Sequence, residues 1–319
     1  MPRYPGISSE AFRHPLDLQA EQALRAVPGF DLFASKFVEY VYERPEFIYN
    51  MGNCIQVGPR QYANLHSIFR EAIADLDVHS EPTLFVTQNP AANSYALGQE
   101  RPFIIITSGA LDLLTDEELR VVFAHELGHI KCGHTTLIQM ALWAMNVVSR
   151  ISDATLGIGG FVSSGLLYAF FEWRRKAELT SDRAALLVTD SLDDVLGTMM
   201  KLAGGSITRM HELSLTEFKR QAQSYQELDR ENLNQIYKFM LYNGIGSRAM
   251  LSHPFPIERV HYIQQWASSE EYQKIKNGTY QHTNSGAVDT PPTSATSEAE
   301  RLRQQIEDLQ SQIDRLKRS

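Results

Sequence analysis

The sequence has few cysteines, no long basic run and no apolar stretch at its start. Its two cysteines, Cys54 and Cys132, share no paired motif, which argues against a disulfide framework. No run of Lys and Arg is longer than 174–176 and the formal net charge is −8, so no nucleic-acid partner is expected. Residues 1–17 lack the apolar segment of a signal peptide, which predicts a cytoplasmic protein.

The apolar content, by contrast, is that of a globular protein: 43% of 319 residues are hydrophobic. Apolar residues recur at helical spacing between about 17 and 74 and over most of the chain after residue 115. Thr83–Thr87 and Phe103–Thr107 have the composition of strands, and 93–96 could form a third. We therefore predict an α+β fold that is mostly helical, with a small sheet of about three strands.

Composition divides the chain into three parts. Residues 1–276 form the predicted globular domain, and 277–297, rich in Gly, Thr, Ser, Pro and Asn, a disordered linker. In 298–319 the apolar residues alternate at spacings of four and three, which predicts a C-terminal coiled coil and a homo-oligomer formed through it. Its seam consists of Leu302, Ile306, Leu309, Ile313 and Leu316.

An apolar hairpin is predicted at 136–171, with polar residues 149–153 between its two legs. The first leg is too short for a bilayer core of about 30 Å. The second leg is uncharged from 154 to 171 but contains four glycines. A membrane span, a membrane-surface contact, an oligomer contact and a plain buried hairpin all stay open for it.

A candidate metal site lies in a helix that begins at the capping box of Thr115 and Glu118. His125 and His129, in an HExxH pattern, are four residues apart, so both imidazoles project from one face and can share a zinc ion. Glu126 lies one step round the helix, where its carboxylate suits a general base that deprotonates water.

The third ligand must come from elsewhere in the chain. The extension His-x-x-Gly-x-x-His is absent, because Cys132 and Thr135 occupy its Gly and His positions. His134 is rotated off the shared face and is interpreted as a capping or surface residue.

Glu178 is the preferred third ligand because Asp182 follows four residues later, on the same helix face. One carboxylate could then bind zinc while the other accepts a hydrogen bond from a ligating histidine. Glu172 competes for the role but has Lys176 four residues later, and a solvated helix face is the alternative for the Glu178 and Asp182 pair.

These residues resemble the HtpX-like and CAAX prenyl protease type 1 zinc metallopeptidases, which belong to the gluzincin group. The resemblance covers roughly 60–265, and its order and spacing are more specific than HExxH alone. The matching segments are 93–96, 107–111, 116–119, 125–134, 177–184, 253–254 and Arg259. One departure is Ser94, where the family usually has Ala.

The resemblance implies a gluzincin-type domain in which His125, His129 and Glu178 bind one Zn²⁺ per chain. It also implies that Glu126 is the catalytic base and that Asp182 supports a ligating histidine.

Four further residues are assigned with the help of the resemblance. His253, before Pro254, is the expected donor to the oxyanion of the tetrahedral intermediate, with an incidental surface histidine as the alternative. Arg259 is expected to hold that loop or the oxyanion. Asn93 and Tyr95 are expected on a strand edge that pairs with extended substrate, although Asn93 could equally be a turn residue.

The leading interpretation is a zinc-dependent metalloendopeptidase that acts on protein or peptide substrates, with a role in protein quality control. The alternative is a non-catalytic, zinc-stabilised chaperone or scaffold. Glu126 argues for the enzyme, because a purely structural zinc site has no use for a base beside its metal.

Overall fold

The computed structural model describes residues 3–27, 29–30, 34, 37, 43–99, 101–143, 158–242 and 253–283. The first half contains η1 (Ser9–Ala11), α1 (Pro15–Arg25), α3 (Glu43–Asn53), β1 (Ile55–Gln56), α4 (Ala63–Asp75), β2 (Thr83–Thr87), β3 (Ser94–Leu97), β4 (Phe103–Thr107), α5 (Ser108–Leu113) and α6 (Asp116–Lys131). Helical residues 134–143 follow. The second half contains α8 (Ile158–Thr189), α9 (Leu192–Gly204), η2 (Ile207–Glu212), α10 (Leu215–Asp229), α11 (Asn232–Tyr242), α12 (Pro256–Ala267) and α13 (Glu270–Lys276). The prediction of a mostly helical α+β fold is confirmed.

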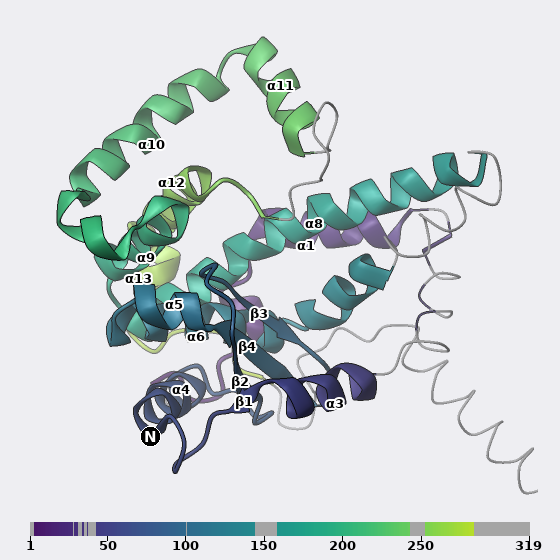
Figure 1. The fold of residues 1–319 in the computed structure, drawn as a ribbon. Coiled ribbons are helices and arrows are strands. Elements are labelled where there is room, and N and C mark those ends of the chain that lie inside the picture. Colours follow the sequence, from purple (N-terminus) through teal and green to yellow (C-terminus); the bar gives the residue numbers. More distant parts are fainter. Residues whose placement is uncertain are drawn as a thin grey trace, which may run out of the picture.

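The sheet has four strands in the order β1-β2-β4-β3, rather than about three. The central strands β2 and β4 are parallel, and β1 and β3 pair antiparallel at the two edges. Alternate residues of β4 point to opposite faces, and every residue of β4 is buried. The sheet is therefore covered on both faces, and Figure 1 shows it at the centre of the molecule with helices around it.

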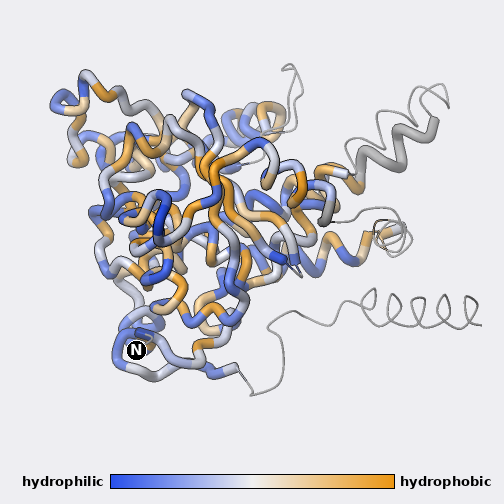
Figure 2. Tube along the Cα trace, turned by 60° about the horizontal axis from the view of Figure 1, so that its bottom comes forward, coloured by the Kyte–Doolittle hydropathy of each residue, from blue (hydrophilic) through white to orange (hydrophobic). Residues whose placement is uncertain are grey.

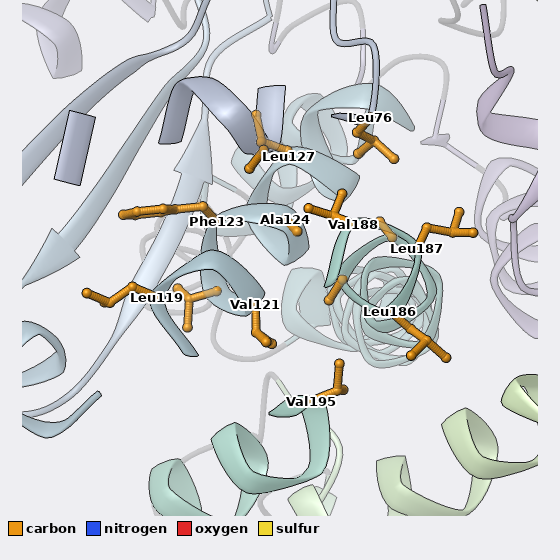
Figure 3. Close-up of a cluster of buried hydrophobic side chains, with 14 of the residues drawn as sticks. Leu76, Leu119, Val121, Phe123, Ala124, Leu127, Leu186, Leu187, Val188 and Val195 are labelled. Carbon is orange, nitrogen blue, oxygen red and sulfur yellow. The ribbon is translucent and has the colours of Figure 1, made fainter. Parts of the chain in front are cut away.

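Two apolar clusters cover the two faces of the sheet. Ile104 and Ile106 of β4 belong to the larger cluster, which joins α4, α6, α8 and α9. Phe103 and Ile105 belong to the other, together with residues of α1, the helical segment 134–143 and α8. The strands stand out as apolar chain in Figure 2. Figure 3 shows how α6 and α8 meet through side chains such as Ala124 and Val188.

Helix α8 is longer than predicted. The second apolar leg, from residue 158 on, and the helix that carries Glu178 form one continuous helix of 32 residues. Helix α1 lies beside it (Figure 1). Within the described part of the first leg, Leu137 and Met140 are buried. The turn of the predicted hairpin lies outside the described residues. Among the described residues, no helix is long and apolar enough to cross a membrane.

Residues 277–283, which composition assigned to the linker, belong to the packed structure. Ile7 and His282 form an antiparallel bridge, and the Tyr280 hydroxyl donates to the Pro5 carbonyl at 3.2 Å. The rest of the predicted linker and the predicted coiled coil lie outside the described residues.

Candidate zinc centre

Helix α6 begins at the predicted capping box. The Thr115 side chain accepts from the Glu118 N–H, and a Glu118 carboxylate oxygen accepts from the Thr115 N–H at 2.9 Å. The helix is buried over most of its surface, and it places the rings of His125 and His129 side by side, with centroids 5.0 Å apart. Both imidazoles of the HExxH pattern therefore face the same neighbour, which is helix α8.

Gly128 lets α6 and α8 approach closely. A Cβ at this position would lie 2.7 Å from the Ala184 Cβ and 3.1 Å from the Ser181 Cα. Since real Cβ atoms essentially never come within 3.0 Å of another heavy atom, only glycine fits here without a shift of the helices. This close contact brings the carboxylates of α8 within reach of the two histidines.

The donor atoms of His125, His129 and Glu178 converge. The Nε2 atoms of His125 and His129 lie 3.2 and 3.5 Å from the Glu178 carboxylate oxygens. One donor atom from each of the three residues lies within 4.8 Å of the other two. His129 and Glu178 are buried, and His125 is nearly so. Two imidazole nitrogens and one carboxylate, with a further position left for water or substrate, are the donors that a catalytic zinc site uses. The residues present therefore fit a zinc ion.

The electrostatics of the site favour a bound cation. Burial alone would raise the pKa of the Glu178 carboxyl, but the field of His253 and the hydrogen bond from His125 hold that pKa well below its usual range. Burial alone would lower the pKa of His125, but hydrogen bonds to Asp182 and Glu178 raise it to about 9. Two ionised carboxylates thus lie beside the histidines in a site nearly closed to water, where a cation can balance their charge.

Asp182 lies behind His125, one helical turn from Glu178. Its Oδ1 is 3.1 Å from Nδ1 of His125, the nitrogen that faces away from Glu178. Arg259 of α12 donates to both oxygens of Asp182, with Nε 2.8 Å from Oδ2. The guanidinium also forms an ion pair with Glu178, 3.7 Å from a carboxylate oxygen, so Arg259 holds a positive charge beside both carboxylates of the site.

Glu126 points toward the edge strand β3. The Ser94 hydroxyl donates to the Glu126 carboxylate at 2.6 Å, and the carboxylate is buried. Ser94 is the residue that departs from the family pattern, and its contact with Glu126 was not predicted. Nothing in the local sequence signals it, because the two residues are 32 positions apart and meet only when β3 packs against α6.

The remaining predicted residues lie around this centre. His253 is half exposed, with Nε2 3.5 Å from a Glu178 oxygen. Asn93 is exposed directly before β3, and its backbone bonds to Thr107, while Tyr95 is exposed within the strand. Glu172, the rejected competitor, pairs with Arg175 at 2.6 Å instead of joining the site.

His134 was interpreted as a capping or surface residue, and this was wrong. It is only 1% exposed, and its ring lies between His129 and Asp17. The local sequence contains no signal of this burial, since Asp17 is 117 residues away.

An HExxH helix packed against a second helix that carries the third donor, next to a small sheet, defines the class of zinc metalloproteases. The chain belongs to peptidase family M48, whose family profile matches residues 59–267. It is therefore a metalloprotease, a hydrolase of peptide bonds with protein or peptide substrates, of a family that depends on zinc. The alternative of a non-catalytic chaperone or scaffold is not favoured.

The relatives agree with this family. The chain is 33% identical over 274 residues to "Plastoglobule-localized metallopeptidase 48, chloroplastic" of Arabidopsis thaliana, covering 85% of this chain and 76% of that protein. It is 25% identical over 264 residues to "Protease HtpX homolog" of Moorella thermoacetica, covering 74% and 83%. No solved structure gives a significant match to the chain.

Proposed function

We propose that this protease holds one zinc ion between His125, His129 and Glu178 and cleaves peptide bonds with Glu126 as general base. The observation that carries the proposal is the convergence of three donor atoms from two helices, with distances of 3.2 and 3.5 Å between the histidine nitrogens and the carboxylate. Glu126 lies on the same turn of α6 as the two histidines, so one rigid helix holds the base and two of the three donors.

Zinc, when bound, would acidify a water molecule and polarise the carbonyl of the scissile bond. The Glu126 carboxylate would accept a proton from the attacking water while the water oxygen forms a bond to the carbonyl carbon. When the C–N bond breaks, the same carboxyl group delivers the proton to the leaving amine, which regenerates the base. The hydrogen bond from Ser94 keeps one oxygen of Glu126 oriented, so the other remains available for the proton.

His253 is proposed to donate a hydrogen bond to the oxyanion. Support comes from its position, because its Nε2 lies 3.5 Å from a Glu178 oxygen and its half-exposed side chain can meet a substrate. Arg259 is proposed to act on the same reaction through Asp182 and Glu178, whose ionised forms its guanidinium stabilises.

Substrate is proposed to bind in extended form along β3. This strand is at an edge of the sheet, with no strand partner on its outer side among the described residues. Unpaired backbone N–H and C=O groups of an edge strand can pair with any extended peptide. Asn93, directly before this strand, and Tyr95 within it are exposed, and both are proposed to contact substrate side chains. Ser94, between them, places the strand within a hydrogen bond of the base.

The decisive test of the base is Glu126→Gln, which preserves shape but cannot accept the proton. The variant should keep its zinc and lose cleavage of an unfolded protein by several orders of magnitude. Equal activity in the variant would contradict the role of Glu126.

The ligand is tested with a matched pair of glutamates on α8. Glu178→Ala should lose zinc, measured by metal analysis after dialysis, whereas Glu172→Ala should retain it, because Glu172 pairs with Arg175 away from the donors. Full zinc occupancy in Glu178→Ala would show that another residue is the third ligand.

The oxyanion role is tested with His253→Ala, which should keep zinc and fold while kcat falls by roughly 100-fold and KM changes little. Loss of zinc, or an unchanged kcat, would contradict the role.

The predicted homo-oligomer and membrane contact depend largely on segments outside the described residues, and both stay predictions.

A further inference from the structure

A second histidine lies directly behind a proposed zinc ligand. His134 is buried, and its Nδ1 is 3.1 Å from Nδ1 of His129. The other nitrogen of His129, Nε2, is the one that faces Glu178. His134 therefore contacts His129 on the side away from the proposed metal, the position from which a neighbouring group sets the orientation and protonation of a ligating imidazole.

His134 is in turn held by a buried carboxylate of helix α1. Nε2 of His134 lies 3.1 Å from Oδ2 of Asp17, whose side chain is fully buried. Asp17 also accepts from the Thr180 hydroxyl at 2.7 Å and from the Trp173 indole N–H at 3.1 Å. Arg13 donates to the same carboxylate at 3.1 Å and balances its charge. With these donors around it, Asp17 stays ionised and acts only as an acceptor.

The positions of the protons follow from this arrangement. Because an ionised Asp17 can only accept, Nε2 of His134 carries a proton and donates it. In a neutral imidazole the other nitrogen is then an acceptor, so Nδ1 of His134 accepts from Nδ1–H of His129. His129, with its proton on Nδ1, presents an unprotonated Nε2 toward Glu178. An unprotonated Nε2 is the form of histidine that binds a metal ion.

We propose that Asp17 and His134 are positioning residues that fix the tautomer and ring orientation of His129 for zinc binding. The inference rests on the proposed zinc site. Asp17 precedes the segment 59–267 that matches the family profile, so helix α1 contributes to the site from outside that segment. Helix α1 packs along α8, which also carries Glu178, so one helix holds both the third ligand and the element that supports His129 (Figure 1).

The test is zinc affinity of the full chain, measured by competition with a chromophoric chelator. His134→Phe keeps a ring but offers no acceptor, and should weaken zinc binding by about 10- to 100-fold. His134→Asn places an amide oxygen near the position of Nδ1, and should restore affinity to within about threefold of wild type. If the Phe variant fails to fold, His134→Gln replaces it. The glutamine amide reaches toward Asp17 rather than His129, so this variant should bind zinc as weakly as expected for His134→Phe.

The role of Asp17 is tested in combination. Asp17→Asn alone should weaken zinc binding by roughly three- to tenfold, because an amide no longer dictates the tautomer of His134. In the His134→Phe background the same change should have no further effect on the zinc Kd, since Asp17 acts on the metal only through His134. Additive losses would show that Asp17 acts by another route and would overturn the proposed relay.

The control is His14→Asn. His14 is another buried histidine near α1, and its side chain accepts from the Leu16 N–H rather than contacting a proposed zinc ligand. Its zinc affinity should equal that of wild type. The inference is overturned if folded His134→Phe or His134→Gln binds zinc as tightly as wild type, or if His14→Asn loses as much. Wild-type protein that binds no zinc would instead refute the proposed zinc site itself.

Discussion

His125 and His129 lie one helical turn apart on α6, yet different parts of the chain support them. Nδ1 of His125 contacts the carboxylate of Asp182 directly, and that carboxylate is paired with Arg259. Nδ1 of His129 contacts a second imidazole, and a carboxylate follows only behind that. On the side away from the proposed metal, one histidine is therefore next to an ionic pair, whereas an imidazole lies between the other histidine and the carboxylate of Asp17.

The difference shows how one helix can receive support from two sides. Asp182 and Arg259 both lie within the segment that matches the family profile, whereas Asp17 comes from the N-terminal helix before it. A direct carboxylate contact strengthens the basicity of its histidine more than a contact relayed through a neutral imidazole. We therefore expect Asp182, the carboxylate in direct contact with His125, to matter more for metal affinity than Asp17, the carboxylate that acts on His129 through His134.

The first prediction tests that ranking. Asp182→Ala removes the acceptor for His125 and leaves Arg259 with Glu178 as its remaining carboxylate partner, so zinc binding should weaken by about 10- to 100-fold. Chelator competition measures the change, with Asp17→Asn assayed in parallel. A greater loss in Asp17→Asn than in Asp182→Ala would reverse the ranking.

The second prediction concerns the packing of α6 against α8, on which the surroundings of both His125 and His129 depend. Gly128→Ala places a methyl group against Ala184 and should force α6 away from α8, which lowers the free energy of unfolding by about 2 to 3 kcal/mol. Urea unfolding of the metal-free protein measures it. Gly204→Ala is the matched control, because a Cβ there meets nothing within 4 Å and stability should stay level or rise slightly. Equal stability of Gly128→Ala and wild type would mean that the two helices can separate at no cost.

The third prediction concerns α1, the helix that supports His129. Burial, together with the charge of Arg183, lowers the pKa of His14 to about 4, whereas an unfolded chain has a pKa near 6.5. Since the unfolded state takes up the proton first, the fold loses stability as pH falls from about 6.5 toward 4.

His14→Asn should remove that part of the acid sensitivity. Asparagine still caps α1 but does not titrate. Between pH 7 and pH 5 the free energy of unfolding of the metal-free variant should therefore fall by up to about 2 kcal/mol less than that of metal-free wild type. Urea unfolding at the two pH values gives the comparison. Identical pH dependence in the two proteins would mean that His14 titrates normally in the fold.

The smallest effect is expected at the base rather than at the ligands. Ser94→Ala removes the hydrogen bond to Glu126 and should lower kcat by about threefold with unchanged zinc content, because one oriented hydrogen bond is lost and the base itself stays. Steady-state cleavage of an unfolded protein measures it. A loss near that of Glu126→Gln would show that Ser94 takes part in the chemistry itself.

Elements defined by short-range patterns could be predicted from the sequence. The strands β2 and β4 have the bounds that their composition indicated, and α6 begins at its capping box. Periodicity, strand composition and caps are local signals, so a single segment is enough to read them. The strand β1 gave no such signal, because it has only two residues and both are exposed.

Contacts between distant segments could not be predicted in the same way. The burial of His134 depends on α1, and the contact between Ser94 and Glu126 depends on how β3 packs against α6. Neither follows from the residues nearby, since burial is decided by tertiary packing. Spacing did place Glu178 and Asp182 on one face, but the continuity of α8 through the apolar leg before them was missed.

The position of α12 in the chain also bears on how the protease is made. Arg259 reaches Asp182 across 77 residues and His125 across 134. During synthesis the HExxH helix leaves the ribosome long before Arg259, and domains fold as units once their sequence is available. A partly synthesised chain therefore carries the histidines without the arginine that completes the surroundings of the site, and the order of residues delays assembly of the hydrolytic centre until the domain is almost whole.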